Sequence, residues 1–302
     1  MKSIPQCLTC FIEDILGAVD MLGVSPAMTT EILSASLAYL ADHVGDDVPP
    51  SYHITGLHRI IKKKLGLAMP FEQARQSSFA AGTQIAALVE KEAATKSDID
   101  KFKLLCRWSV AANSLDFRTA GAGYDLSTDA VEKLLRAYAT AGLTVDELDA
   151  IFAVVKQANR IVYVPDNVGE LPFDKLLISQ LTSFGAHVTV PFRGGPITSD
   201  AVMADAIAAG IPDVAASVIL AGPDTLGISF TEMSDELAFA LSKADVIIAK
   251  GQANYYVLSA YGRQFTKAHI VCLFTAKCSH VWQQFGCTKK ASIAAIIQKP
   301  VQ

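Results

Sequence analysis

The segment Arg160–Glu170, RIVYVPDNVGE, decides the fold of the second half of this chain. Its first part, Ile161–Val164, is a run of mostly β-branched residues that predicts a buried strand. Pro165 ends that strand, because proline has no N–H to donate to a neighbouring strand. The residues that follow at the strand's carboxyl end bring three oxygen-bearing side chains and one hinge, Asp166, Asn167, Gly169 and Glu170.

The carboxyl edge of an open α/β sheet is where ligands bind. The carboxylate of Asp166 and the amide oxygen of Asn167 are hard ligands, suited to Mg²⁺, Mn²⁺ or a similar cation. A purely structural interpretation also exists, in which the pair forms an Asx turn that caps a helix beginning near Leu171.

From Ala158 onward the pattern alternates between strands and helices, which predicts a largely parallel sheet with crossover helices. We expect strands at 161–164, 187–190, 218–220, 245–249 and 270–275, and helices at 171–185, 202–209 and 236–242. Polar residues follow several of these strands: Arg193, Asp200, Lys250, Gln252, Asn254 and Lys277.

Residues 1–155 are instead dominated by helical periodicity. We expect helices at 10–22, 29–40, 53–64, 71–91, 97–113 and 130–141, the last capped from Ser127, and a polar loop at 45–52. In the stretch AANSLDF (111–117), Asn113 and Asp116 are three residues apart and share a face on a helical turn. They either reach into a cleft together, or Asn113 caps a helix and Asp116 is solvated.

The composition excludes some functions. The chain has 302 residues, 51% of them hydrophobic, and a net charge of −4, so it can bury two domain cores and lacks the basic face that nucleic acids or anionic membranes require. We find no apolar run of roughly 18 residues. Glu13 and Asp14 interrupt the region where a signal peptide needs its apolar centre. We therefore expect a cytoplasmic protein without nucleic-acid or membrane partners, and the apolar content is compatible with a homo-oligomer.

Six cysteines occur, at 7, 10, 106, 272, 278 and 287. Without a signal peptide they are read as thiols rather than as a disulfide framework. Cys7 and Cys10 form one CxxC. They are half of a zinc site, a redox pair outside the usual strand–CxxC context, or plain thiols.

Taken together, the strand ends predict phosphate-ester chemistry. Asp166, Asn167 and Asp200 offer three oxygens to one divalent cation, while Arg193 or Lys250 offers a positive charge to phosphate oxygens. The glycines match neither a Walker A loop nor GxGxxG, which argues against ordinary nucleotide binding.

The ordered segments DNVGE (166–170), RGGPITSD (193–200), ADA (204–206), ADVIIAKGQAN (244–254) and AKC (276–278) resemble the DUF89 family, also called the damage-control phosphatases with an ARMT1-like fold. The CxxC and the AANSLDF stretch resemble its prokaryotic CxxC-bearing subfamily. The resemblance implies an α/β fold in which an all-helical N-terminal domain, residues 1–155, packs on a Rossmann-like three-layer α/β/α domain with a mainly parallel sheet, residues 156–302.

The resemblance also implies a function and a site. Members are metal-dependent phosphatases that act on small phosphorylated metabolites, including sugar phosphates, with Mg²⁺, Mn²⁺, Co²⁺ or Ni²⁺. The family's metal ligands correspond to Asp166, Asn167 and Asp200, and its phosphate-contacting lysine to Lys250. Substrate-binding residues are expected at Asn113, Asp116, Arg193, Gln252 and Asn254.

Two further acidic residues are candidates for proton transfer. Asp205 or Asp245 could orient the attacking water or act as base, although the first could simply cap its helix and the second could begin a strand. A ligand aspartate acting as nucleophile stays open. Glu170 could fix a ligand from behind.

The sequence departs from the family at Ser199, where Asn is common before the third ligand, and at Ala253, Tyr255 and Tyr256, where GQGN followed by Phe and Glu is common. These differences bear on substrate preference. Two other functions remain: a carboxyl methyltransferase using S-adenosylmethionine, for which DNVGE is a poor glycine-rich turn, and a non-catalytic binder of phosphorylated metabolites.

Overall fold

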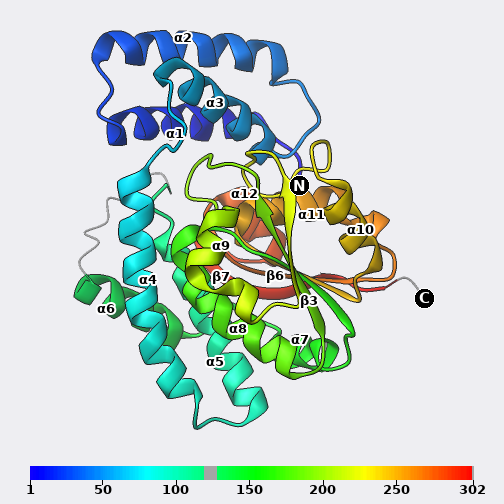
Figure 1. The fold of residues 1–302 in the computed structure, drawn as a ribbon. Coiled ribbons are helices and arrows are strands. Elements are labelled where there is room, and N and C mark those ends of the chain that lie inside the picture. Colours follow the sequence, from blue (N-terminus) through cyan, green and yellow to red (C-terminus); the bar gives the residue numbers. More distant parts are fainter. Residues whose placement is uncertain (119–127, 301–302) are drawn as a thin grey trace.

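One mainly parallel sheet organises the molecule (Figure 1). The structure is a computed structural model that describes residues 1–118 and 128–300. In these residues the strand order is β1-β7-β6-β5-β2-β3-β4. All neighbours run parallel except β6 and β7, which pair antiparallel. The strands are Val145–Asp146 (β1), Arg160–Val164 (β2), His187–Arg193 (β3), Ser217–Gly222 (β4), Val246–Lys250 (β5), His269–Ala276 (β6) and Ala291–Gln298 (β7).

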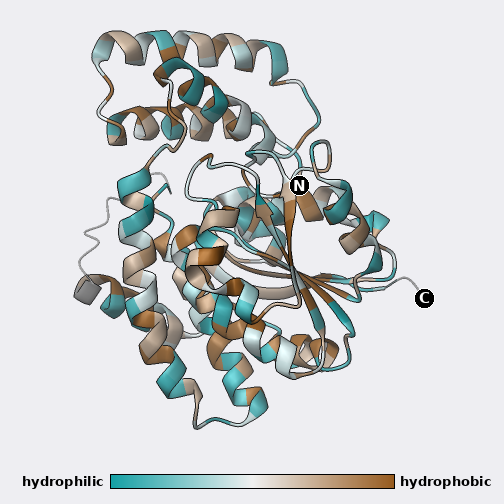
Figure 2. Ribbon diagram, in the orientation of Figure 1, coloured by the Kyte–Doolittle hydropathy of each residue, from teal (hydrophilic) through white to brown (hydrophobic). Residues whose placement is uncertain are grey.

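Helices cover both faces of this sheet. Successive side chains of a strand point to opposite faces, and in β2 Ile161 and Tyr163 join one hydrophobic core while Val162 and Val164 join the other. The first core contains side chains of α4 (Glu72–Ala93), α5 (Asp98–Ala111), α6 (Thr128–Ala141), α7 (Leu148–Val155), α8 (Leu171–Ser183) and α9 (Met203–Ala209). The second contains side chains of α10 (Asp235–Lys243), α11 (Gly251–Tyr261) and α12 (Ser279–Trp282). Figure 2 shows hydrophobic residues along the strands between these layers.

Three N-terminal helices form a separate unit above the sheet in Figure 1, namely α1 (Cys7–Met21), α2 (Pro26–His43) and α3 (Pro50–Leu65). They share a third hydrophobic core around Phe11, Ile15 and Leu57. Val168, which follows β2, also packs in this core. The helical unit is thereby joined to the strand ends where ligands are expected.

Short 3₁₀ turns complete the chain: Ala112–Leu115 (η1), Val168–Glu170 (η2), Ile211–Asp213 (η3), Gly262–Gln264 (η4) and Gln283–Phe285 (η5). The turns η1 and η2 lie beside each other and carry residues of the candidate site. Gly169 in η2 has no room for a Cβ, which would lie 2.1 Å from Ser78 Oγ on α4. A glycine there lets α4 pass directly against the turn that follows β2.

The α/β fold class and the mainly parallel sheet are confirmed. The sequence did not predict β1, β7 or α11, and α3 begins at Pro50, inside the stretch expected to be a loop. The cap expected at Ser127 lies outside the described residues. The division of the chain at residue 155 stays a prediction. Within residues 1–118 and 128–300, no helix combines the length and apolar character that a membrane crossing needs.

Candidate active site

Two loops meet at the carboxyl edge of the sheet and bring the expected metal ligands together. Ala201 N donates to Asp166 O at 2.8 Å, and Val168 N donates to Ser199 O at 2.9 Å. These bonds form an antiparallel bridge between Asn167 and Asp200, residues that are 33 apart in sequence. Asp166, Asn167 and Asp200 are nearly buried, and all three line one cavity of about 830 Å³.

Hydrogen bonds fix the orientation of the Asn167 amide. Its Nδ2 donates to Asp166 Oδ2 at 2.9 Å and to Glu170 Oε1 at 2.7 Å. Its Oδ1 accepts a hydrogen bond from Ser199 Oγ at 2.7 Å. Because carboxylates only accept, the nitrogen must face them, and the amide oxygen remains available as a donor to a cation.

The charges of the site suit a cation. Burial, then the charges of Glu170 and Asp200, raises the pKa of Asp166 well above its usual value. Burial also raises the pKa of Asp200, although the Arg193 guanidinium opposes this. Bonds from the two asparagines reach only Oδ2 of Asp166. No donor side chain in the described ranges reaches its Oδ1. An excess of buried negative charge with a free oxygen is what a divalent cation relieves.

This donor set is incomplete by itself. Among the described residues, no three His, Cys, Asp or Glu side chains are grouped so that they could hold a metal ion. The two carboxylates and one amide of this site fit a hard cation that takes its remaining ligands from water or from substrate oxygens.

Arg193 supports the site from behind. It is fully buried, donates from Nη1 to Pro165 O at 2.7 Å, and places Nη2 2.8 Å from Asp200 Oδ2. Gly227 N also donates to this Asp200 oxygen at 2.7 Å. Arg193 is absent from the cavity wall. The structure therefore does not support the expected contact between Arg193 and substrate, and instead gives it a role in holding Asp200.

Lys250 is buried beneath the site as well. Its Nζ donates to Glu170 Oε2 at 2.5 Å and to Asp174 Oδ1 at 3.1 Å, and all three side chains are inaccessible to solvent. Burial lowers the pKa of Lys250, but the two carboxylates outweigh it and raise the pKa, so the lysine stays charged. Because Lys250 does not line the cavity, the expected phosphate contact has no geometric support.

Asn113 and Asp116, which lie in and directly after the 3₁₀ turn η1, take different positions at the site. Asn113 is buried and donates from Nδ2 to Glu170 Oε1 at 2.8 Å and to Asp166 Oδ2 at 3.2 Å. Asp116 lines the cavity, and its Oδ1 lies 2.8 Å from Ser199 Oγ, whose single hydrogen is shared between Asp116 and the Asn167 amide oxygen. Of the two expected substrate-binding residues, only Asp116 faces the cavity.

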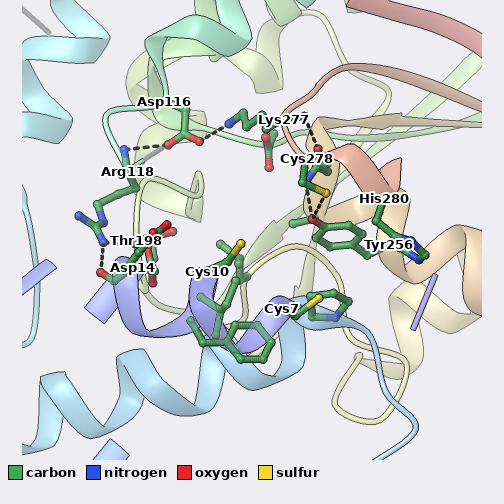
Figure 3. A pocket seen from close by; sticks show the side chains of 18 of the residues that line it. Cys7, Cys10, Asp14, Asp116, Arg118, Thr198, Tyr256, Lys277, Cys278 and His280 are labelled. Carbon is green, nitrogen blue, oxygen red and sulfur yellow. Dashed lines mark hydrogen bonds and ion pairs between the residues drawn. The ribbon is translucent and has the colours of Figure 1, made fainter. Parts of the chain in front are cut away.

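Two cationic side chains of the described residues line the cavity, Arg118, which pairs with Asp14, and Lys277, whose Nζ donates to Asp116 Oδ2 at 2.6 Å. Figure 3 shows Lys277 and Asp116 at the upper wall of the pocket. Burial lowers the pKa of Lys277, but the Asp116 carboxylate more than offsets this and the pKa is raised. Sequence reasoning placed Lys277 after a strand and inside a family segment without giving it a role. Its position at the carboxyl edge was the available signal.

Gln252 and Asn254 both lie on the first turn of α11, but only one of them lines the cavity. Gln252 lines the cavity and accepts a hydrogen bond from Lys277 N at 2.7 Å. Asn254 is fully buried, donates to Lys250 O at 2.8 Å and accepts from Ile228 N at 2.8 Å. Asn254 therefore joins two loops and is absent from the cavity wall, and its expected contact with substrate stays a prediction.

The two acidic candidates for proton transfer lie outside the cavity wall. Asp205 pairs with Arg75 and accepts a hydrogen bond from Val202 N at 2.8 Å at the start of α9. Asp245 accepts bonds of 2.9 Å from Asn159 N and Arg160 N, at the amino end of β2. Asp205 thus caps its helix and Asp245 stands at the entry of a strand, which are the structural alternatives given for them. Neither position gives geometric support to the expected catalytic role.

The fold and the site define a class of protein: an α/β protein with a carboxylate-rich cleft at the carboxyl edge of its parallel strands, roofed by helices. The chain belongs to the damage-control phosphatase ARMT1-like domain family, which matches residues 3–293. Its place in a CxxC-bearing subfamily stays a prediction.

Named relatives agree with this membership. A damage-control phosphatase of Archaeoglobus fulgidus is 28% identical over 298 residues, covering 99% of this chain and 100% of its own. A damage-control phosphatase of Pyrococcus horikoshii is 29% identical, covering 97% of each chain. The crystal structure of a DUF89 family protein from Pyrococcus horikoshii superposes with a TM-score of 0.87 at 28% identity, covering 99% of this chain and 100% of that one.

Proposed function

We propose that this protein is a metal-dependent phosphomonoesterase that hydrolyses small phosphorylated metabolites. The observation that carries the proposal is the meeting of Asp166, Asn167 and Asp200 in one cavity with Lys277 on its wall. The two relatives that are named damage-control phosphatases support the same activity.

The proposed roles follow from position. Asp166, Asn167 and Asp200 would hold a divalent cation, which when bound neutralises phosphoryl oxygens and lowers the pKa of the attacking water. Glu170 and Asn113 keep the Asn167 amide and the Asp166 carboxylate turned toward the cavity. Glu170 is thus a positioning residue, because it touches ligands rather than substrate.

Lys277 supplies a positive charge to the transferred phosphoryl group. Its ammonium is paired with Asp116, so one of the two must be displaced or shared when a phosphate arrives. Gln252 holds the backbone at Lys277 in place through the bond to Lys277 N. With Asp205 and Asp245 outside the cavity, Asp116 is the carboxylate on the wall nearest to this lysine and is the better candidate to orient water.

The experiment is phosphate release from a panel of sugar phosphates and other small phosphate esters. It uses protein stripped of metal, the same protein with Mg²⁺, Mn²⁺, Co²⁺ or Ni²⁺ added back, and the Asp166→Ala variant. We expect turnover that requires a cation and disappears in the variant. A folded protein that binds the cation and the esters but releases no phosphate would be a binder rather than an enzyme. The choice of cation and of substrate is a prediction that this panel decides.

A methyltransferase would need a different turn after its first strand. S-adenosylmethionine sites of Rossmann type rely on a glycine-rich turn that admits the cofactor backbone. Here the chain after β2 is closed by the bridge to residues 199–201 and by α4 against Gly169. The hydrolytic proposal fits this turn better.

A further inference from the structure

Thiols form part of the wall of the same cavity, and the proposed hydrolysis does not use them. Cys7 and Cys10 lie on the first turn of α1, and Cys278 follows β6 directly after Lys277. Figure 3 shows the three sulfurs around the lower and right-hand parts of the pocket. Residues 7 and 278 are at opposite ends of the sequence, so the fold, and not chain proximity, brings them together.

The spacing of Cys7 and Cys10 suits a disulfide. Cys7 is the first residue of α1, and Cys10 follows three positions later. In an α-helix, residues at this spacing have Cα atoms about 5 Å apart. That separation lies inside the range of roughly 4.4–6.8 Å found across disulfide bonds. The two thiols can therefore bond to each other after side-chain rotation at a helix end, with little backbone movement.

Accessibility separates the cavity thiols, among which Cys278 is partly exposed, from the other three cysteines. Cys10 is exposed and Cys7 is partly exposed, and both open onto the cavity. Cys106 and Cys272 are fully buried in hydrophobic cores. Cys287 is partly exposed but lies outside the cavity wall, with its Sγ 3.7 Å from Phe285 O. A small reagent in the cleft meets Cys10 first and finds Cys7 one helical turn away.

Two other arrangements of these thiols are less favoured. A soft metal ion would need at least three ligands, and no three His, Cys, Asp or Glu side chains of the described residues are grouped to hold one, which includes Cys7, Cys10, Cys278 and His280. Cys278 is a poorer disulfide partner, because it belongs to another segment and its Sγ lies 3.9 Å from Gln252 Nε2 and from Tyr256 Oη.

We propose that Cys7 and Cys10 are a reversible dithiol–disulfide site in the wall of the cleft, which reacts with low-molecular-weight disulfides. The Cys10 thiolate attacks one sulfur of the small disulfide, forms a mixed disulfide and releases one small thiolate. The Cys7 thiolate then attacks Cys10 Sγ, closes the protein disulfide and releases the second. Two electrons pass from the protein to the small disulfide, and the protons of both thiols end on the two small thiols.

The rate of this exchange has a physical limit. Burial, followed by the neighbouring sulfurs, raises the pKa of Cys10, and burial raises the pKa of Cys7. Both groups are therefore mainly protonated at neutral pH, and the nucleophile is the thiolate. Exchange should be slow near pH 7 and faster at about pH 8.5.

The test treats the folded, full-length protein with glutathione disulfide at about pH 8.5, alkylates the remaining thiols and maps them by mass spectrometry. We expect wild type to lose two of its six thiols to a Cys7–Cys10 disulfide that dithiothreitol reverses. Cys278→Ser and Cys287→Ser, the matched controls, should form the same disulfide. Cys7→Ser should stop at a glutathione adduct on Cys10.

Other results would overturn the proposal. One is a disulfide that includes Cys278, and another is failure of Cys278→Ser to form the Cys7–Cys10 disulfide. A third is a wild-type protein that stops at a glutathione adduct on Cys10 without forming that disulfide. Zinc retained by the protein in amounts that follow Cys7 and Cys10 would assign the thiols to a metal instead. This measurement does not use phosphate release, so its failure is separate from failure of the proposed hydrolysis.

Discussion

Replacing Lys250 with methionine separates two roles for this residue, a phosphate ligand or a buried counter-charge. The chain places its ammonium against Glu170 and Asp174, with all three side chains inaccessible to solvent. Methionine keeps much of the volume and removes the charge. The variant therefore leaves two carboxylates buried without their cation, directly beneath Asn167 and Asn113.

The expected cost follows from the chemistry of buried ion pairs. Removing one partner of such a pair destabilises a protein by about 3–5 kcal/mol, because the other charge is left uncompensated. Whole domains are stable by only about 5–15 kcal/mol. Adding Glu170→Gln to Lys250→Met removes one stranded charge, while Asp174 keeps hydrogen bonds from Ser109 and Tyr163. The double variant should recover at least about 1 kcal/mol, as groups in contact are not additive.

The assay is urea unfolding followed by tryptophan fluorescence, since Trp108 is buried and stacks on Phe173, next to Asp174. We expect a large fall in unfolding free energy for Lys250→Met and partial recovery in the double variant. Lys277→Met is the matched control on the cavity wall, and it should cost no more than about 2 kcal/mol, because its partner Asp116 is still partly exposed. If Lys250→Met unfolds like wild type and only raises KM for the phosphate ester, Lys250 is a substrate ligand and the reasoning is wrong.

Three further predictions concern the cavity. Lys277→Met should lower kcat/KM for a phosphate ester by roughly 10²-fold or more, as expected for a lost transition-state charge, while calorimetry finds cation binding retained; unchanged kinetics would remove Lys277 from the mechanism. Gly251→Ala should weaken both cation binding and turnover, since φ is +77° and a Cβ would lie 1.8 Å from Asp166 Oδ2; wild-type affinity by calorimetry would contradict the close approach. Burial opposes ionisation of Asp116, but Lys277 and its hydrogen bonds lower its pKa to about 2. Because the pKa of Asp116 in the folded state lies below the usual 3.8, the ionised carboxylate stabilises the fold above about pH 4, and this stabilisation is lost as the pH falls toward 2. In urea unfolding of the metal-free protein at a series of pH values, Asp116→Asn should therefore lack about 2 kcal/mol of the acid-dependent loss of unfolding free energy seen in wild type.

The sequence predicted that the proposed metal ligands would lie together, because their placement depends on local rules. Pro165 ends a strand, and the carboxyl ends of parallel strands share one edge, which places Asp166, Asn167 and Asp200 together. The bridge between Asn167 and Asp200 makes that convergence closer than the strand order alone requires.

The sequence did not predict which of the polar residues line the cavity and which are buried beneath it. Lys250 and Lys277 both follow β-strands, yet one is buried under Glu170 and the other lines the cavity, and nothing in the local pattern distinguishes them. Asp245 differs from both lysines already in the sequence, because it precedes β5 and its carboxylate binds the amino end of β2.

The missed elements have comparable causes. The strand β7, ASIAAIIQ, has no polar alternation, because Ala294 joins one hydrophobic core while Ile293 and Ala295 join the other. Periodicity does not separate such a run from a short buried helix. The sequence also did not predict that Cys278 lines the same cavity as Cys7 and Cys10, because only the fold brings Cys278 close to α1.

The central claim is that a cation held by Asp166, Asn167 and Asp200 is required for hydrolysis. The most direct measurement is Mn²⁺ binding by calorimetry and phosphate release on the same preparations of wild type, Asp200→Asn and Asp245→Asn. We predict that Asp200→Asn loses both binding and turnover, and that Asp245→Asn, outside the cavity, retains both. Turnover that persists in Asp200→Asn without bound Mn²⁺ would contradict the claim.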